Sequence, residues 1–462
     1  MTTAADVVII GSGQAAGPLA TALVEAGKRV VLIEREHLGG TCVNVGCTPT
    51  KTMIASGRVA YLTRRAGDYG VHVGDVRVDM ESVRQRKRDM VVEWRSGSEE
   101  RLLGKDNPRT LFGEASFTGP HEVRVVLNDG GEERFTAETI VINAGERPAP
   151  LDIPGADEIE VLTSTTVMEL GEVPDHLVVI GGGYVAVEFG QLFRRLGAEV
   201  TIIQRGPQLL SREDEDIATA VRETLEEDGL TILTHASAKT ARNVDGGIEL
   251  DVEVGGETRT IRGSHLLAAA GRVPNSDSLN LDAGGIETDE SGHIPTDDRL
   301  RTNVPGVYAV GDIRPGPKFT HISYDDFRVL NANLSRGESR SIEGRLVPYT
   351  AFMDPQLGRI GITEAQARNA GKSIRVAHMP MTSVARAMET DESRGVMKAI
   401  VDAETDRVLG AAILGIEGGE IASMLQIAMM GDLPYTALRD GIFAHPGLAE
   451  ALNNLFSSFR EE

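Results

Sequence analysis

The chain has 462 residues, of which 41% are hydrophobic, and its 69 acidic and 47 basic residues give a formal net charge of -22. This length predicts roughly three or four domains, and the negative charge argues against nucleic acid or an anionic membrane as a partner. The sequence has no apolar stretch near membrane-spanning length and no leader pattern at its start, so we expect a cytoplasmic protein.

The chain opens with the pattern of a dinucleotide-binding unit. Residues 7–10 predict a buried parallel strand, and residues 29–33 predict a second strand that ends at Glu34. Between them, a turn containing Gly11, Gly13 and Ala16 opens a helix that extends to about residue 26. In such units the backbone N–H groups at the helix start receive a pyrophosphate, and the acidic residue at the strand end binds a ribose hydroxyl.

The only two cysteines, Cys42 and Cys47, follow directly after this unit. Residues five apart on a regular helix point in directions that differ by roughly 140°, so a disulfide between them needs an irregular backbone. Gly39, Gly40 and Gly46, with Pro49 after them, supply that irregularity. In a reducing cytosol a pair of this kind favours redox catalysis over a structural disulfide; the alternatives are inert buried thiols or half of a metal site.

The same pattern returns in the middle of the chain. Strands are predicted at residues 177–180 and 200–203, joined by a turn that contains Gly181, Gly183 and Ala186. The second strand ends at Gln204-Arg205, at the offset where the first copy has Glu34. Gln204 removes a charge that would repel a 2′-phosphate and Arg205 can bind one, so this site favours NADPH, with NADH as the alternative if Arg205 is only a solvated loop residue.

Further segments complete a family resemblance. Residues 139–148, 269–275, 307–312 and 443–450 are similar to motifs of the class I pyridine nucleotide-disulfide oxidoreductases, the family of glutathione reductase, dihydrolipoamide dehydrogenase and mercuric reductase. The resemblance implies an α/β fold with two Rossmann-like dinucleotide-binding domains and a C-terminal α+β dimerisation domain. The implied ranges are 1–150 for FAD, 151–270 for NAD(P), 271–345 for a central segment that completes the FAD domain, and 346–462 for the interface domain.

The resemblance also assigns cofactor contacts. Those for FAD are Gly11, Gly13, Ala16, Glu34, Gly40, Thr41, Lys51, Gly145, Gly311 and Asp312. Those for NADPH are Gly181, Gly183, Gln204, Arg205 and Gly271. Tyr184, at the start of the second helix, is expected to cover the flavin until nicotinamide displaces it, with plain packing as the alternative.

The catalytic roles follow the same resemblance. Cys47 is expected to face the flavin as the charge-transfer thiolate, while Cys42 exchanges electrons with the substrate. His445 is the expected general acid and base, oriented by Glu450.

Another expected element is an ion pair between Lys51 and Glu188 near the flavin, with a solvated surface pair as the alternative. His321 lies just beyond Asp312 in the sequence, and its role stays open.

The implied assembly is a homodimer whose active sites are shared across the interface. Residues 42–51 and 319–327 are most similar to mercuric-reductase-like proteins, including the reactive-chlorine-resistance flavoproteins that reduce copper(II). We therefore expect a soft metal ion such as copper(II) or mercury(II) as electron acceptor, bound only transiently at Cys42 and Cys47, with no structural metal. Because the last residues contain no further cysteine pair, efficient mercury(II) turnover is not expected. The alternatives are reduction of a low-molecular-weight disulfide and a redox-sensing flavoprotein.

Overall fold

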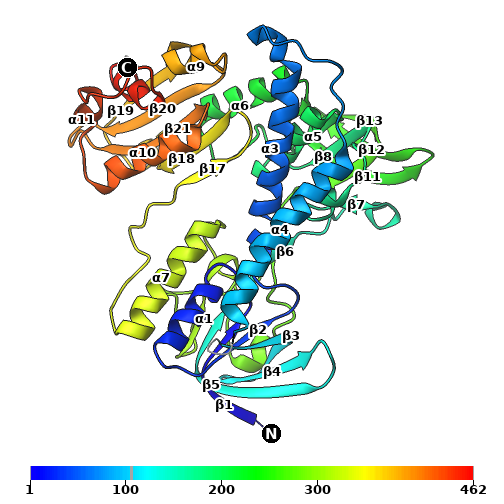
Figure 1. Cartoon of the computed structure of the whole chain (residues 1–462), viewed down its shortest axis with the longest axis vertical. Coiled ribbons are helices and arrows are strands. Elements are labelled where there is room, and N and C mark those ends of the chain that lie inside the picture. The colour runs from blue at the N-terminus through cyan, green and yellow to red at the C-terminus, as the bar shows by residue number, and fades with distance from the viewer. Residues whose placement is uncertain (1, 105–107, 461–462) are drawn as a thin grey trace. The chain divides into compact units, whose positions relative to one another are not determined.

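The computed structural model describes residues 2–104 and 108–460 and divides them into two compact units. The first unit combines Met1–Thr52, Arg84–Ala149 and Gly271–Arg345, and the second combines Met53–Val83, Pro150–Ala270 and Leu346–Glu462. Figure 1 shows the elements of each unit. The four domain ranges expected from the sequence stay a prediction; they include residues 1, 105–107 and 461–462, which lie outside the described part.

The strands are β1 (Thr2–Ile10), β2 (Val30–Glu34), β3 (Arg109–Gly119), β4 (Glu122–Leu127), β5 (Glu132–Ile142), β6 (Glu146–Pro148), β7 (Val161–Leu162), β8 (His176–Ile180), β9 (Glu199–Ile203), β10 (Thr231–Leu233), β11 (Ala236–Val244), β12 (Gly247–Val254), β13 (Glu257–Gly263), β14 (His265–Ala268), β15 (Arg272–Pro274), β16 (Val307–Ala309), β17 (Tyr349–Ala351), β18 (Gln356–Gly361), β19 (Ile374–Pro380), β20 (Val396–Asp402) and β21 (Val408–Gly415). The α-helices are α1 (Ala16–Glu25), α2 (Gly40–Asn44), α3 (Cys47–Arg64), α4 (Met80–Leu102), α5 (Tyr184–Leu196), α6 (Glu215–Glu227), α7 (Thr320–Arg336), α8 (Glu364–Asn369), α9 (Ala385–Glu389), α10 (Gly418–Met430), α11 (Tyr435–Arg439) and α12 (Ala451–Leu455). None of the helices within these described residues is both long and apolar enough to cross a bilayer.

The first unit is built on a mixed sheet whose parallel strands have β1 at their centre, while β4 pairs antiparallel with β3 and β5. β1 pairs with β2 on one side and with β5 on the other, β3 extends the sheet beyond β2, and β16 extends it beyond β5. Val7, Val8, Ile9 and Ile10 are all at most 5% exposed, as expected for a strand covered on both faces. Helices α1 and α7 pack against one another in this unit (Figure 1). The predicted order of strand, glycine turn, helix and strand is therefore present.

The second unit contains a parallel sheet of its own, with the order β10-β9-β8-β14-β7. Helix α5 packs on β8 and β9, which gives the second copy of the predicted strand, turn, helix and strand. The strands β11, β12 and β13 form a separate antiparallel sheet. The C-terminal part of this unit is a five-stranded antiparallel sheet in the order β17-β18-β21-β20-β19, with α10 packed on β18 and β21.

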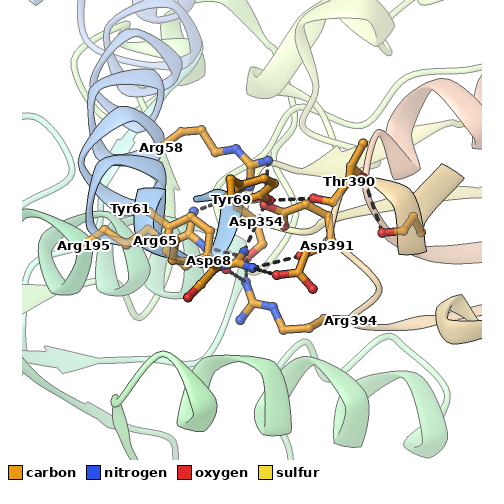
Figure 2. A network of polar contacts seen from close by, with 12 residues as sticks. Arg58, Tyr61, Arg65, Asp68, Tyr69, Arg195, Asp354, Thr390, Asp391 and Arg394 are labelled. Carbon is orange, nitrogen blue, oxygen red and sulfur yellow. Dashed lines mark hydrogen bonds and ion pairs between the residues drawn. The ribbon is translucent and has the colours of Figure 1, made fainter. Parts of the chain in front are cut away.

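An arginine-rich network stabilises the second unit around the ring of Tyr61 on α3 (Figure 2). The guanidinium carbons of Arg195 and Arg65 lie 3.8 and 5.1 Å from the centre of this ring. Both Arg195 and Arg58 pair with the carboxylate of Asp354, which lies between β17 and β18. Burial alone would raise the pKa of Asp354, but the two guanidinium groups hold the pKa of this carboxyl below its usual value.

Replacing Asp354 with asparagine is expected to lower the free energy of unfolding by about 3 kcal/mol at pH 7, because Arg195 and Arg58 each lose one of their two carboxylate partners. Asp228 remains beside Arg195 and Glu392 beside Arg58. The native pKa of Asp354 lies below the unfolded value, so its contribution is present above about pH 4 and is lost as the pH falls through the native pKa. Urea unfolding at several pH values measures the difference.

Asp391→Asn is a matched control in the same network, since this carboxylate is 63% exposed and pairs with Arg65 at the surface. Its effect should stay below about 1 kcal/mol. Equal effects of the two substitutions would show that the ion pairs of Asp354 add no more to stability than an exposed ion pair does.

Candidate active site

The turn between β1 and α1 has the shape of a pyrophosphate cradle. Gly11 has a φ of +93°, and a Cβ atom there would lie 2.3 Å from the carbonyl oxygen of Asn143. A Cβ on Gly40 would lie 2.7 Å from the Cα of Gly13, so these backbones approach one another as only glycine allows. The first N–H groups of α1 have no partner inside the helix, and the first of them, on Ala16, donates to Oδ1 of Asn143 at 3.3 Å. The turn therefore fits the phosphates of FAD.

Glu34 lies beside this turn at the end of β2. Its Oε2 accepts hydrogen bonds from the backbone nitrogen of Ser12 at 3.0 Å and from the Ser12 hydroxyl at 2.6 Å. The same hydroxyl accepts a hydrogen bond from the backbone nitrogen of Gly39 at 3.1 Å. These contacts fix the carboxylate next to the glycine turn, where the sequence predicts a ribose contact.

The second glycine turn repeats this geometry in the other unit. Gly181 has a φ of +118°, and its Cβ would lie 2.3 Å from the carbonyl oxygen of Ala269. Helix α5 begins after Gly183, which has no side chain that could cap the helix. Gln204 directly follows β9 and donates to the carbonyl oxygen of Gln208 at 3.1 Å, while Arg205 is exposed. Tyr184 is 39% exposed at the start of α5.

The two cysteines lie where the chain passes from α2 to α3. Helix α2 ends at Asn44 and α3 begins at Cys47, so the predicted irregular backbone is present. The sulfur of Cys47 lies 3.3 Å from the hydroxyl of Thr320, the first residue of α7. The hydrogen bond that the Cys42 thiol donates to Cys47, together with burial, raises the pKa of Cys42. When one proton leaves the pair, the charge therefore rests on Cys47.

A buried acidic cluster of the first unit lies near Cys47. Burial, the neighbouring carboxylate of Glu146 and, to a smaller extent, Cys47 together raise the pKa of Asp312 to about 6. The positive charges of Arg272 and Lys318 oppose this shift. Glu146 is 5% exposed, and its Oε1 lies 2.8 Å from Nε2 of His293 and 3.0 Å from Nζ of Lys318. No local pattern in the sequence predicted this cluster, because His293 and Glu146 lie 147 residues apart.

The remaining predicted catalytic residues belong mainly to the second unit. Nδ1 of His445 lies 2.8 Å from Oε2 of Glu450, and the histidine side chain is 68% exposed. Glu188 is 4% exposed and accepts a hydrogen bond from the backbone nitrogen of Phe352 at 2.8 Å. Lys51 belongs to the first unit, so its ion pair with Glu188 stays a prediction.

His321, whose role the sequence leaves open, stacks on Phe319 in the first unit, with ring centroids 5.4 Å apart. Among the described residues, no group of three or more His, Cys, Asp or Glu side chains could hold a metal ion.

Comparison with known proteins defines the class. Residues 5–326 match the family described as pyridine nucleotide-disulphide oxidoreductase, and residues 347–456 match the dimerisation domain of that family. The chain therefore belongs to the pyridine nucleotide-disulfide oxidoreductases, which confirms the predicted fold class and makes it an oxidoreductase that uses FAD and NAD(P)H. Its dimerisation domain supports a homodimer.

Individual relatives show which members of this family the chain resembles. The probable pyridine nucleotide-disulfide oxidoreductase RclA of Escherichia coli is 38% identical over 97% of this chain and 98% of that protein. A mercuric reductase of Bacillus cereus is 35% identical over 99% of this chain and 72% of that protein. A solved structure titled as the Cu(II) complex of the HOCl-induced flavoprotein disulfide reductase RclA has a TM-score of 0.90 and 36% identity, and the match covers 99% of each chain. The predicted resemblance is confirmed by these matches.

Proposed function

We propose that this protein transfers electrons from NADPH, by way of FAD, to a disulfide formed by Cys42 and Cys47, and from the resulting dithiol to a soft metal ion such as copper(II) or mercury(II). The observation that carries the proposal is the side-chain hydrogen bond between Cys42 and Cys47, which pairs the two thiols and raises the pKa of Cys42. FAD, when bound, supplies the two-electron relay between nicotinamide and the sulfur pair.

The proposed cycle balances in both halves. One NADPH and one proton convert the disulfide into two thiols and release NADP⁺. The dithiol then gives one electron to each of two copper(II) ions, or two electrons to one mercury(II) ion, loses two protons and closes the disulfide again. Cys47 holds the negative charge beside Thr320, while Cys42 meets the acceptor.

Two observations support a metal ion as acceptor. Thiolates are soft ligands and bind copper and mercury strongly. In addition, the RclA structure that this chain resembles is titled as a Cu(II) complex. The NADPH-dependent rate in the presence of copper(II), mercury(II), glutathione disulfide, lipoamide or oxygen alone tests the proposal. We expect copper(II) to give a rate well above that with oxygen alone; rates equal to the oxygen blank for both metals would contradict it.

Reduction of a low-molecular-weight disulfide is a second candidate, and the contact between His445 and Glu450 favours it. An imidazole held by a carboxylate can protonate a leaving thiolate, a step that a metal ion does not need.

We further propose that His445 of the partner subunit completes each active site. We also propose that the four predicted domain ranges hold, and that the protein works in the cytoplasm, where reduced thiols persist.

Preference for NADPH is tested by Arg205→Glu. Because the exposed guanidinium is proposed to bind the 2′-phosphate, the substitution should lower kcat/KM for NADPH about tenfold or more and leave kcat/KM for NADH nearly unchanged. Steady-state kinetics with both nucleotides measure the effect. Arg222→Ala on α6, where the arginine pairs with Glu226 at 2.8 Å, serves as the control. An equal loss with both nucleotides would contradict the assignment.

A further inference from the structure

A fully buried carboxylate on α7, that of Asp326, has no role in the proposed chemistry. Its side chain is 0% exposed, and its Oδ2 accepts a hydrogen bond from the backbone nitrogen of Gly311 at 2.9 Å. Two arginines neutralise it: Nε of Arg314 lies 3.1 Å from Oδ2, and Nη1 of Arg345 lies 2.7 Å from Oδ1. Burying a charge is costly, so a carboxylate retained here with two partners points to a positional role.

Gly311 is the residue before Asp312, and the backbone at this point is tightly enclosed. Its φ is +67°, and a Cβ atom there would lie 2.8 Å from Nδ2 of Asn143 and 2.9 Å from the hydroxyl of Ser323 on α7. The same Nδ2 of Asn143 donates to the carbonyl oxygen of Val310 at 2.9 Å. Hydrogen bonds to both polar groups of the Val310–Gly311 peptide, its carbonyl and its N–H, therefore fix the turn that presents Asp312.

Helix α7 carries a second element of the site. Its first residue is Thr320, whose hydroxyl lies 3.3 Å from the sulfur of Cys47. Asp326 lies six residues further along the same helix and is bonded to the turn before Asp312. One buried side chain thus connects the residue expected to hold the flavin ribityl chain with the helix that contacts the flavin-side sulfur.

We infer that Asp326 is a positioning residue, which fixes Asp312 through the backbone of Gly311 and holds α7, with Thr320, in register with it. The inference deepens the proposed function and rests on its assignment of Asp312 to FAD. Asp326 touches neither cofactor nor substrate; it acts through the turn. Without the carboxylate, Gly311 loses its acceptor, the buried Arg314 loses its carboxylate partner, and Arg345 keeps only the longer contact with Asp325.

The dissociation constant of FAD from the full-length apoprotein, measured by quenching of flavin fluorescence, tests the inference without turnover. Asp326→Ala should raise this constant about tenfold or more. Asp326→Asn should raise it less, because an amide oxygen of the same size can still accept from Gly311. Asp325→Asn is the matched control: the neighbouring side chain is 33% exposed, approaches Arg345 only at 3.4 Å, and should leave the constant unchanged.

A double-mutant cycle separates positioning from general destabilisation. If Asp326 acts through Asp312, then Asp326→Ala should change FAD binding less than about twofold in an Asp312→Asn background. Additive effects, or unchanged affinity in both Asp326 variants, would overturn the inference. If the Asp326→Ala variant does not fold, the same double-mutant cycle is measured with Asp326→Asn. Wild-type apoprotein that takes up no FAD would instead contradict the proposed function itself.

Discussion

Replacing Cys47 with serine is expected to abolish the long-wavelength charge-transfer absorbance that NADPH produces in the wild-type protein, and to lower metal reduction by about a thousandfold or more. The raised pKa of Cys42 leaves the negative charge of the pair on Cys47, and a serine hydroxyl stays protonated at neutral pH. Anaerobic absorbance spectra after addition of NADPH measure the first effect, and steady-state rates with copper(II) measure the second.

Cys42→Ser is the informative companion variant. It should be equally inactive, yet it should retain a charge-transfer band, and should show one even before NADPH is added, because Cys47 then has no disulfide partner. A band of equal strength in both variants, or in neither, would show that the two sulfurs do not have the distinct roles assigned to them.

Replacing His445 with glutamine is expected to separate the two candidate acceptors. The imidazole is held 2.8 Å from Glu450, and as a general acid it should contribute about a hundredfold to the reduction of a disulfide substrate. Metal reduction involves no leaving thiolate that must be protonated. We therefore expect rates with glutathione disulfide or lipoamide to fall about a hundredfold, while the rate with copper(II) changes less than about threefold.

Glu450→Gln tests whether the carboxylate acts through the histidine. It should shift the pH profile of disulfide reduction, since the neutral amide no longer stabilises the imidazolium form. Equal losses with copper(II) and with disulfides in the His445 variant would contradict the separation and would indicate that the histidine serves both acceptors in the same way.

Local sequence signals predicted the parts of the molecule that depend on neighbours along the chain. Both glycine turns were predicted because a strand, a turn and a helix follow one another within about 25 residues, and the turn geometry itself requires glycine at Gly11 and Gly181. The irregular backbone between Gly40 and Cys47 follows from its glycines. The contact between His445 and Glu450, five residues apart, was implied by the family resemblance of residues 443–450.

Contacts between distant segments were not predictable in this way. Glu146 meets His293 and Lys318 only because β6 is brought beside the segment that leads to α7, and no periodicity in the sequence reports that packing. The arginines around Tyr61 appear in the sequence as ordinary surface charges. Asp326 follows the similar residue Asp325 directly, and only the fold shows that one is buried and the other is not.

Thiol counting under anaerobic conditions tests the central claim most directly. One equivalent of NADPH added to the oxidised, full-length protein should create two new alkylatable thiols per chain, which peptide mass spectrometry should assign to Cys42 and Cys47, and copper(II) should then remove both. Consumption of NADPH and copper(II) with no change in the alkylation of either cysteine would contradict the account.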